Sequence, residues 1–137
     1  MTERLIEPLI RQALETHLAA LEPELQTVWQ NRDPDPGFDS NAAHQKAFLL
    51  PVATVAKGLR QKTELHSGIF QVNLCYPAGI GTNDVESRGA ALKEHFKGRK
   101  LEAEGVTVSI VGIPSIAAPV NLSPYVVPVT IRYASIN

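Results

Sequence analysis

The side chains best suited to chemistry are four histidines and one cysteine: His17, His44, His66, His95 and Cys75. Imidazole and thiolate groups bind metals and act as bases or nucleophiles. No histidine has a second histidine or an acid at the spacing that places two metal ligands on one helix face. Cys75 lies in a predicted strand, where a buried and inert thiol is usual. These residues predict neither a metal centre nor a catalytic site.

Two acids in a proline-rich segment have the spacing of a calcium loop, Asp33 and Asp35. Gly37 follows one position too early for an EF-hand, and His44 stands where the bidentate glutamate is required. We therefore expect no calcium site. A segment this long without regular structure is often functional, which makes residues 31–43 a candidate for contact with a partner.

A glycine pair before a predicted helix, Gly79-Ile80-Gly81, is typical of a phosphate-binding turn. The third glycine of that motif is missing, and Asp84 and Glu86 would repel a phosphate at the helix N-terminus. We expect no cofactor. A small cytoplasmic enzyme or ligand-binding domain, with residues 79–83 at the rim of its pocket, stays an alternative.

Composition narrows the class of protein further. The chain has 137 residues, 44% of them hydrophobic and 20% charged, which predicts one globular domain over residues 1–137. A net charge of −1 argues against a general nucleic-acid clamp. The single cysteine excludes an internal disulfide, and neither a signal peptide nor a membrane-spanning run is found. We expect synthesis and folding in a cytoplasm.

The residues around Cys75 define the strongest expected element. Between Gly68 and Tyr76, apolar and polar residues alternate with the period of a strand that has one buried face. Gly68 and Pro77 are expected to end it on either side. We predict that this segment is the central strand of an antiparallel sheet.

Two amphipathic segments predict the helices. The first covers residues 5–21, with Pro8 either kinking the helix or lying near its start. The second covers residues 83–97, where Asn83 and Glu86 have the form of a capping box. Gly89 would let that helix approach the sheet, and Gly98 would end it.

Further alternating segments predict strands at 27–30, 46–55, 101–104, 106–110 and 125–133. Pro51 and Pro128 interrupt two of these strands and imply an edge position or a bulge. Residues 57–63 and 115–124 are expected to form connections. The predicted fold class is α+β, a mostly antiparallel sheet with two helices packed on it.

Taken in order, these motifs resemble a known family. Gly68-Ile69-Phe70-Gln71-Val72 and Tyr76-Pro77-Ala78-Gly79-Ile80-Gly81 are similar to the central signature of phage tail terminators, the lambda-like minor tail protein U group. Similar motifs precede and follow it: Trp29-Gln30-Asn31, Leu49-Leu50-Pro51, His95-Phe96 with Gly98 and Leu101, and the closing strand 125–133. Residues 31–43 depart from the family, because they are rich in Asp and Pro where a more aromatic, extended segment is expected.

The resemblance implies a structural virion protein without enzymatic activity. Members are expected to form a homohexameric ring on the last ring of the tail tube, to stop tube polymerisation and to offer a surface to the head-completion or neck protein. Genome DNA would pass through the lumen without specific binding, no membrane is involved, and the protein would lie at the head-proximal end of the tail. Another neck or head-closure protein is the alternative within phage assembly.

Interface residues are expected in two segments. The first choice is the long loop 31–43, with Phe38 expected to be exposed on it, and the second is the basic connection 57–63. Trp29, two residues before the loop, is a further candidate. The candidates are Trp29, Asp33, Asp35, Phe38, Lys57, Arg60 and Lys62.

Overall fold

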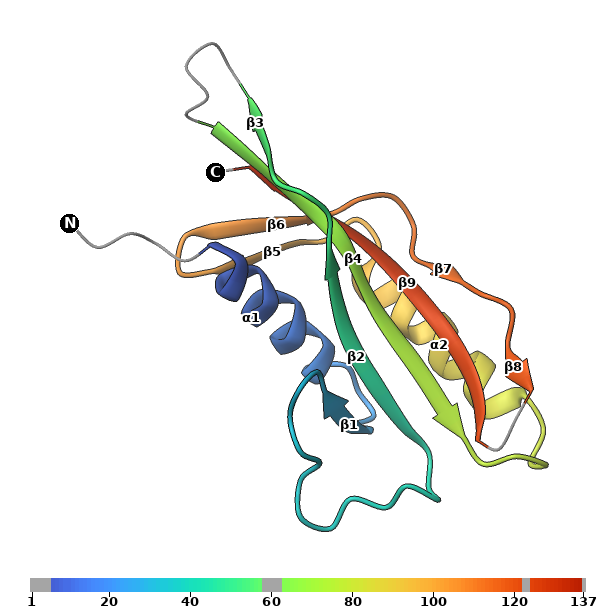
Figure 1. The fold of residues 1–137 in the computed structure, drawn as a ribbon. Helices are drawn as coiled ribbons and strands as arrows, with labels where there is room; N and C mark the ends of the chain where they lie inside the picture. The colour runs from blue at the N-terminus through green and yellow to red at the C-terminus, as the bar shows by residue number, and fades with distance from the viewer. Residues whose placement is uncertain (1–5, 58–62, 122–123, 137) are drawn as a thin grey trace.

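The computed structural model describes residues 6–57, 63–121 and 124–136 (Figure 1). Two helices and nine strands are present in this part of the chain. In chain order they are α1 (Ile6–Ala19), β1 (Gln26–Trp29), β2 (His44–Pro51), β3 (Val55–Lys57), β4 (Thr63–Tyr76), α2 (Asn83–Phe96), β5 (Lys100–Ala103), β6 (Val106–Ile110), β7 (Ser115–Ile116), β8 (Val120–Asn121) and β9 (Tyr125–Ile136).

All described strands belong to one curled sheet. Its main order is β1-β2-β4-β9-β6-β5, with β3 added beside β4 and with β7 and β8 added beside β9. Every pairing is antiparallel except that of β1 with β2, which is parallel. The predicted antiparallel sheet is therefore correct for all neighbours but one.

The parallel pair explains the length of segment 31–43. Antiparallel neighbours can be joined by two residues, whereas parallel neighbours need a crossover of about a dozen residues or more. The chain leaves β1 at Trp29 and returns to begin β2 at His44, beside Gln26. The long loop is thus first a topological requirement of this pairing.

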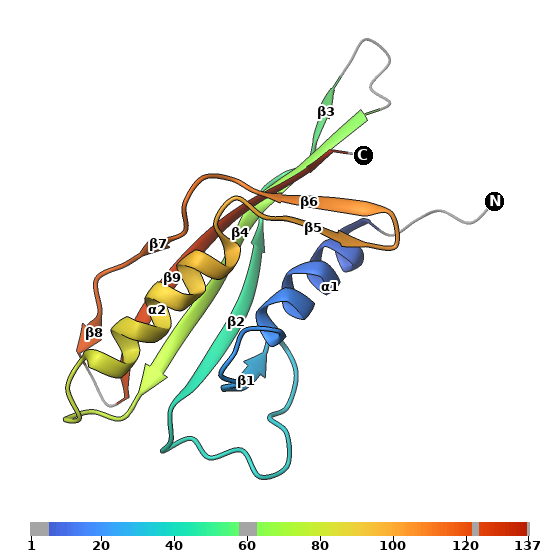
Figure 2. The ribbon, with the colours of Figure 1, turned by 180° about the vertical axis from the view of Figure 1, so that it is seen from behind.

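The core lies between the sheet and the two helices. Phe70, Val72 and Leu74 of β4 are fully buried, and their register partners on β9 carry the same apolar face. Figure 2 shows α2 lying over β4 and β9, while α1 packs against β5 and β6. On the opposite face of β4, Ile69 and Gln71 are only half-buried. This one-sided burial produces the alternation seen in the sequence.

Gly68 does not end the central strand as predicted. β4 runs through it and begins at Thr63. A Cβ atom at Gly68 would lie 2.6 Å from the carbonyl oxygen of Leu50 and 2.7 Å from the Tyr133 hydroxyl. Glycine is needed here because the neighbouring strands leave no room for a side chain, not because the chain turns.

The first helix begins just before Pro8, so the proline occupies the first turn and causes no interior break. The predicted capping box at the second helix is wrong. Thr82 is the N-cap residue, and it makes no side-chain capping bond. Gly98 has a φ of +66°, as expected for the residue that ends the helix.

Both strand prolines lie where no ladder bond is lost. Pro51 is paired with Gly68 on one side, beyond the last residue that β1 covers on the other. The Pro128 carbonyl accepts from the Ala117 N–H at 2.9 Å, at the break between β7 and β8. Pro51 thus lies at a local edge, whereas Pro128 lies at a gap between β7 and β8 in a strand that is itself interior, between β4 and β6. Segment 115–124, expected to be a loop, contains these two short strands.

Candidate interaction surface

The long loop is held against β1 by one side chain. The Gln26 Oε1 atom accepts from the Asp39 N–H at 2.9 Å. Its Nε2 atom donates to the carbonyl oxygens of Asp39 and Ala43, at 3.2 Å in each case. The N–H of Asn41 donates to Asp39 Oδ1 at 2.9 Å, which closes a local turn. The loop therefore has a defined path around the sheet edge.

The structure brings two of the four candidates in and before the long loop to one hollow. Trp29 and Asp35 line it, whereas Asp33 is exposed outside it. Phe38 is half-buried, since its ring packs edge-on against that of His44 at a centroid distance of 5.1 Å. The expectation of an exposed Phe38 is corrected: much of its surface serves to anchor the loop on β2.

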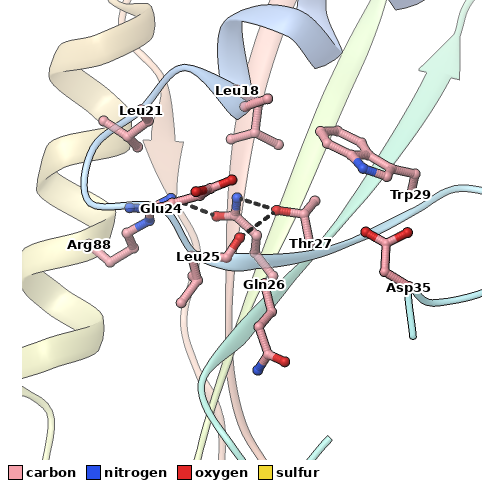
Figure 3. Close-up of a pocket in the computed structure, with 11 residues that line it drawn as sticks. Leu18, Leu21, Glu24, Leu25, Gln26, Thr27, Trp29, Asp35 and Arg88 are labelled. Carbon is pink, nitrogen blue, oxygen red and sulfur yellow. Dashed lines mark hydrogen bonds between the residues drawn. The ribbon is translucent and has the colours of Figure 1, made fainter. Parts of the chain in front are cut away.

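This hollow has a volume of about 450 Å³ and opens between α1, β1 and the long loop (Figure 3). Leu18, Leu21 and Trp29 give it apolar walls, and Arg88 lies at one end. Exposed Glu24 and Asp35 also line it, which places negative charge at its mouth. The lining combines apolar and polar side chains, and no acid and base among these residues converge on one point.

Arg88 is the most unusual polar residue of this region. Its side chain is only 6% exposed. One terminal nitrogen donates to the Pro23 carbonyl oxygen at 2.5 Å, and the other donates to Gln45 Oε1 at 3.4 Å. Burial lowers the pKa of its guanidinium from the ordinary value. Its Nε atom is buried and has no hydrogen-bond partner among the described residues.

The hydrogen bonds continue from Arg88 across the sheet edge, as the dashed lines of Figure 3 show. Gln45, which is 1% exposed, donates to Thr27 Oγ1 at 3.0 Å. Thr27 in turn donates to the Leu25 carbonyl oxygen at 3.0 Å. This network ties α2 to β2, β1 and the segment before β1. The network has a structural role, because its hydrogen bonds hold these elements together.

Sequence reasoning missed Arg88, although a signal was present. Arg88 follows Val85 by three positions and precedes Leu92 by four, and both of these residues are buried on the sheet-facing side of α2. A charged residue at such a position must be buried. The helical period alone could have singled it out.

The second predicted contact segment is described only at its margin. Lys57 is the last residue of β3, paired with Thr63 of β4. Arg60 and Lys62 lie outside the described residues.

Two histidines form a reciprocal contact between the helices. The rings of His17 and His95 stack with centroids 3.8 Å apart. The Nε2 atom of each ring lies within hydrogen-bond distance of the other residue's backbone carbonyl oxygen, at 2.7 and 2.6 Å. In the described part of the chain, no group of three His, Cys, Asp or Glu side chains is close enough to hold a metal ion.

Cys75 is buried in β4, and burial raises its pKa. A higher pKa means less thiolate at neutral pH, so this thiol is a poor nucleophile. Neither described helix has the length and hydropathy needed to cross a membrane.

Comparison with known proteins identifies the family. The family model described as phage tail terminator protein matches residues 9–133. A solved structure is similar to this chain with a TM-score of 0.77 and 26% sequence identity, and the alignment covers 96% of each chain. No curated protein matches the chain. Because the family model spans all the elements from α1 into β9, the chain belongs to the phage tail terminator family.

Proposed function

We propose that this protein ends the phage tail tube: it caps the last tube ring as a homohexamer, stops further polymerisation and presents the surface that joins the head. The match of the terminator family over residues 9–133 carries this proposal. The similar solved structure supports the fold on which the proposal rests, since the likeness extends over nearly the whole of both chains.

Physical reasoning about tubes supports this role. A tube grows because the top of each ring fits the bottom of the next, which is a heterologous contact that never closes on itself. A terminator must fit the last ring on one face and offer a different surface on the other. Such work requires two dissimilar surfaces and a ring seam but no reacting group.

The charge of the subunit suits a conduit for DNA. The genome would pass through the lumen of the ring on its way out of the head. A strongly basic lumen would hold the phosphate backbone, because each neutralised phosphate adds to the affinity. The net charge of −1 favours passage without specific binding.

Deletion of the gene tests the proposal. Phage particles without this protein should carry tails of abnormal and variable length that fail to join heads, as measured by electron microscopy of lysates. Tails of normal length that still join heads would contradict it. Labelling the protein in intact particles should place it between tail and head; a position inside the head vertex would favour a head-closure role.

The absence of catalysis is part of the proposal and has its own test. A thermal-shift screen of the purified protein with nucleotides and divalent metals should leave the melting temperature unchanged. A shift of several degrees with any compound would support a ligand-binding domain or an enzyme instead.

A further inference from the structure

Two separate segments of the surface carry apolar side chains and no charge. The first, the arm segment, covers residues 50–56, and every residue of it is exposed. Leu50, Val52 and Val55 are its large apolar side chains, with Val52 exposed by 56%. β3 begins within it at Val55 and pairs only with β4 among the described strands.

The second, the rim segment, covers residues 111–120. All of its residues except Pro114 are exposed, and none is charged. Val111, Ile113, Ile116 and Val120 supply its large apolar side chains, with Ile113 exposed by 58%. β7 and β8 lie in this region and pair only with β9 in the described part of the chain.

Such segments are unusual on a free surface. Roughly a quarter to a third of the surface residues of a soluble domain are expected to be charged. Contiguous exposed apolar residues mark surfaces that another molecule covers. The outer edges of β3, β7 and β8 have no strand partner among the described residues, and Pro51, Pro114 and Pro119 limit uncontrolled strand pairing.

The two segments start level with each other near the middle of the long ribbon that β4 and β9 form, and from there they run towards opposite ends of it (Figure 1). β3 pairs with residues 63–65 at one end of β4. β7 and β8 pair with β9 near its start, where β9 in turn pairs with the other end of β4. The segments also lie on opposite sides of the ribbon, because β3 extends it from β4 and the rim segment extends it from β9.

We propose that the arm segment of one subunit docks on the rim segment of a second copy of this chain. Both surfaces are apolar and uncharged, so each matches the other's chemistry without leaving a buried charge. They are different surfaces at different places, which makes the contact head-to-tail. A head-to-tail contact repeats from copy to copy and closes into a ring if the rotation allows.

This inference deepens the proposed function, because it names the seam of the ring on which that function rests. Two variants, each with one of the two segments damaged, test the seam. A chain with a damaged arm keeps a working rim but finds no working arm on its own copies. A chain with a damaged rim has the opposite defect. Each variant alone should therefore associate only weakly, whereas an equal mixture can form one working contact.

The variants are Val52→Asp for the arm and Ile113→Asp for the rim. Both residues lie outside strands, so the changes spare the sheet ladder. Ile80→Asp is the matched control, because Ile80 is likewise an exposed apolar loop residue, at 56%, in neither segment. Association is measured by light scattering and sedimentation equilibrium from micromolar to millimolar concentration, and melting temperatures verify folding.

Wild-type protein and Ile80→Asp should associate as concentration rises. Val52→Asp and Ile113→Asp should each associate at least about tenfold more weakly, and their mixture should stop at a dimer. If either aspartate variant melts early, Val52→Thr and Ile113→Thr replace the pair.

Three results would overturn the proposed seam: wild-type monomers at every concentration, association of both variants like wild type, or dimers of either variant alone, which would indicate a symmetric contact. Tail length after gene deletion distinguishes a failure of the proposed seam from a failure of the proposed function. Overlong tails in the deletion phage, together with unimpaired association of both variants, would refute only the seam.

Discussion

The His17–His95 pair places two imidazole rings face to face between the C-terminal turns of the helices. Each Nε2 atom faces a carbonyl oxygen and must donate to it, which leaves Nδ1 without a proton in both neutral rings. Burial lowers the pKa of His17 most strongly. The His95 carbonyl acts in the opposite direction, and the charges of His95 and Arg99 lower the pKa further.

This arrangement predicts that the protein loses stability as the solution becomes acidic. The folded pKa of His17 lies below the ordinary value of 6.5. As pH falls through 6.5, the unfolded chain therefore takes up a proton before the folded chain does. The stabilisation from the neutral ring is complete above that pH and declines towards the folded pKa. Urea unfolding between pH 8 and pH 5 measures the effect.

The variant His17→Gln serves as the comparison, because its amide can donate a hydrogen bond but cannot be protonated in this range. It should have a flatter dependence of unfolding free energy on pH below 6.5. Equal slopes for wild type and His17→Gln would show that groups other than His17 govern the acid response.

Arg88 gives a second prediction at the scale of single residues. Arg88→Ala should lower the free energy of unfolding by about 3 kcal/mol, because it leaves the Pro23 carbonyl and the Gln45 amide without their charged donor. Chemical denaturation measures the loss. Ser87→Ala is the control, since Ser87 is the exposed neighbour on the same helix and should cost little.

Equal stability of Arg88→Ala and Ser87→Ala would contradict the bracing role. If Arg88→Met is as stable as the wild type, packing of the aliphatic stem, not hydrogen bonding, is what matters at this position.

Among whole elements, Gly68 sets how closely the three central strands approach. Gly68→Ala should destabilise the protein by about 1–3 kcal/mol, because its Cβ atom would meet the backbone of Leu50 and Pro51 and the Tyr133 hydroxyl. Denaturation midpoints measure the loss. Ser67→Ala, one residue earlier in β4, lacks this conflict and should change stability little. A stable Gly68→Ala would show that the strands can separate at no cost.

The elements that the sequence predicted well have one buried face and alternate strictly. Val106, Val108 and Ile110 of β6 and the buried row of β9 are examples, because alternation reports one-sided burial directly. The two-residue strands β7 and β8 gave no such signal, since they are exposed and defined only by pairing with β9. Pairing between distant segments is invisible to local periodicity.

The candidate contact surface was predicted less well for a related physical reason. Composition showed that segment 31–43 is a loop, but the parallel pairing that requires its length depends on tertiary structure. Phe38 could not be assigned to His44 from sequence, because the two residues meet only after the loop returns to the sheet. The uncharged runs 50–56 and 111–120 are readable in the sequence, yet only the structure shows that they are exposed.

At the scale of the whole molecule, the proposed function requires a subunit that fits the tube end and offers no site for the next tube ring. Purified protein added to polymerising tube subunits should therefore shorten the tubes, and more strongly as the ratio of terminator to tube protein rises. Tube lengths measured by electron microscopy provide the test.

The seam variants separate capping from simple binding. If a closed ring is the capping unit, Val52→Asp and Ile113→Asp should each need a much higher concentration than wild type or Ile80→Asp to shorten the tubes. Without the ring, a single subunit engages only one subunit of the tube end and loses the gain in affinity that comes from several linked contacts. Equal capping by all four proteins would mean that the tube end itself assembles the ring, or that single subunits are sufficient. Unchanged tube lengths with wild-type protein would contradict the capping role itself.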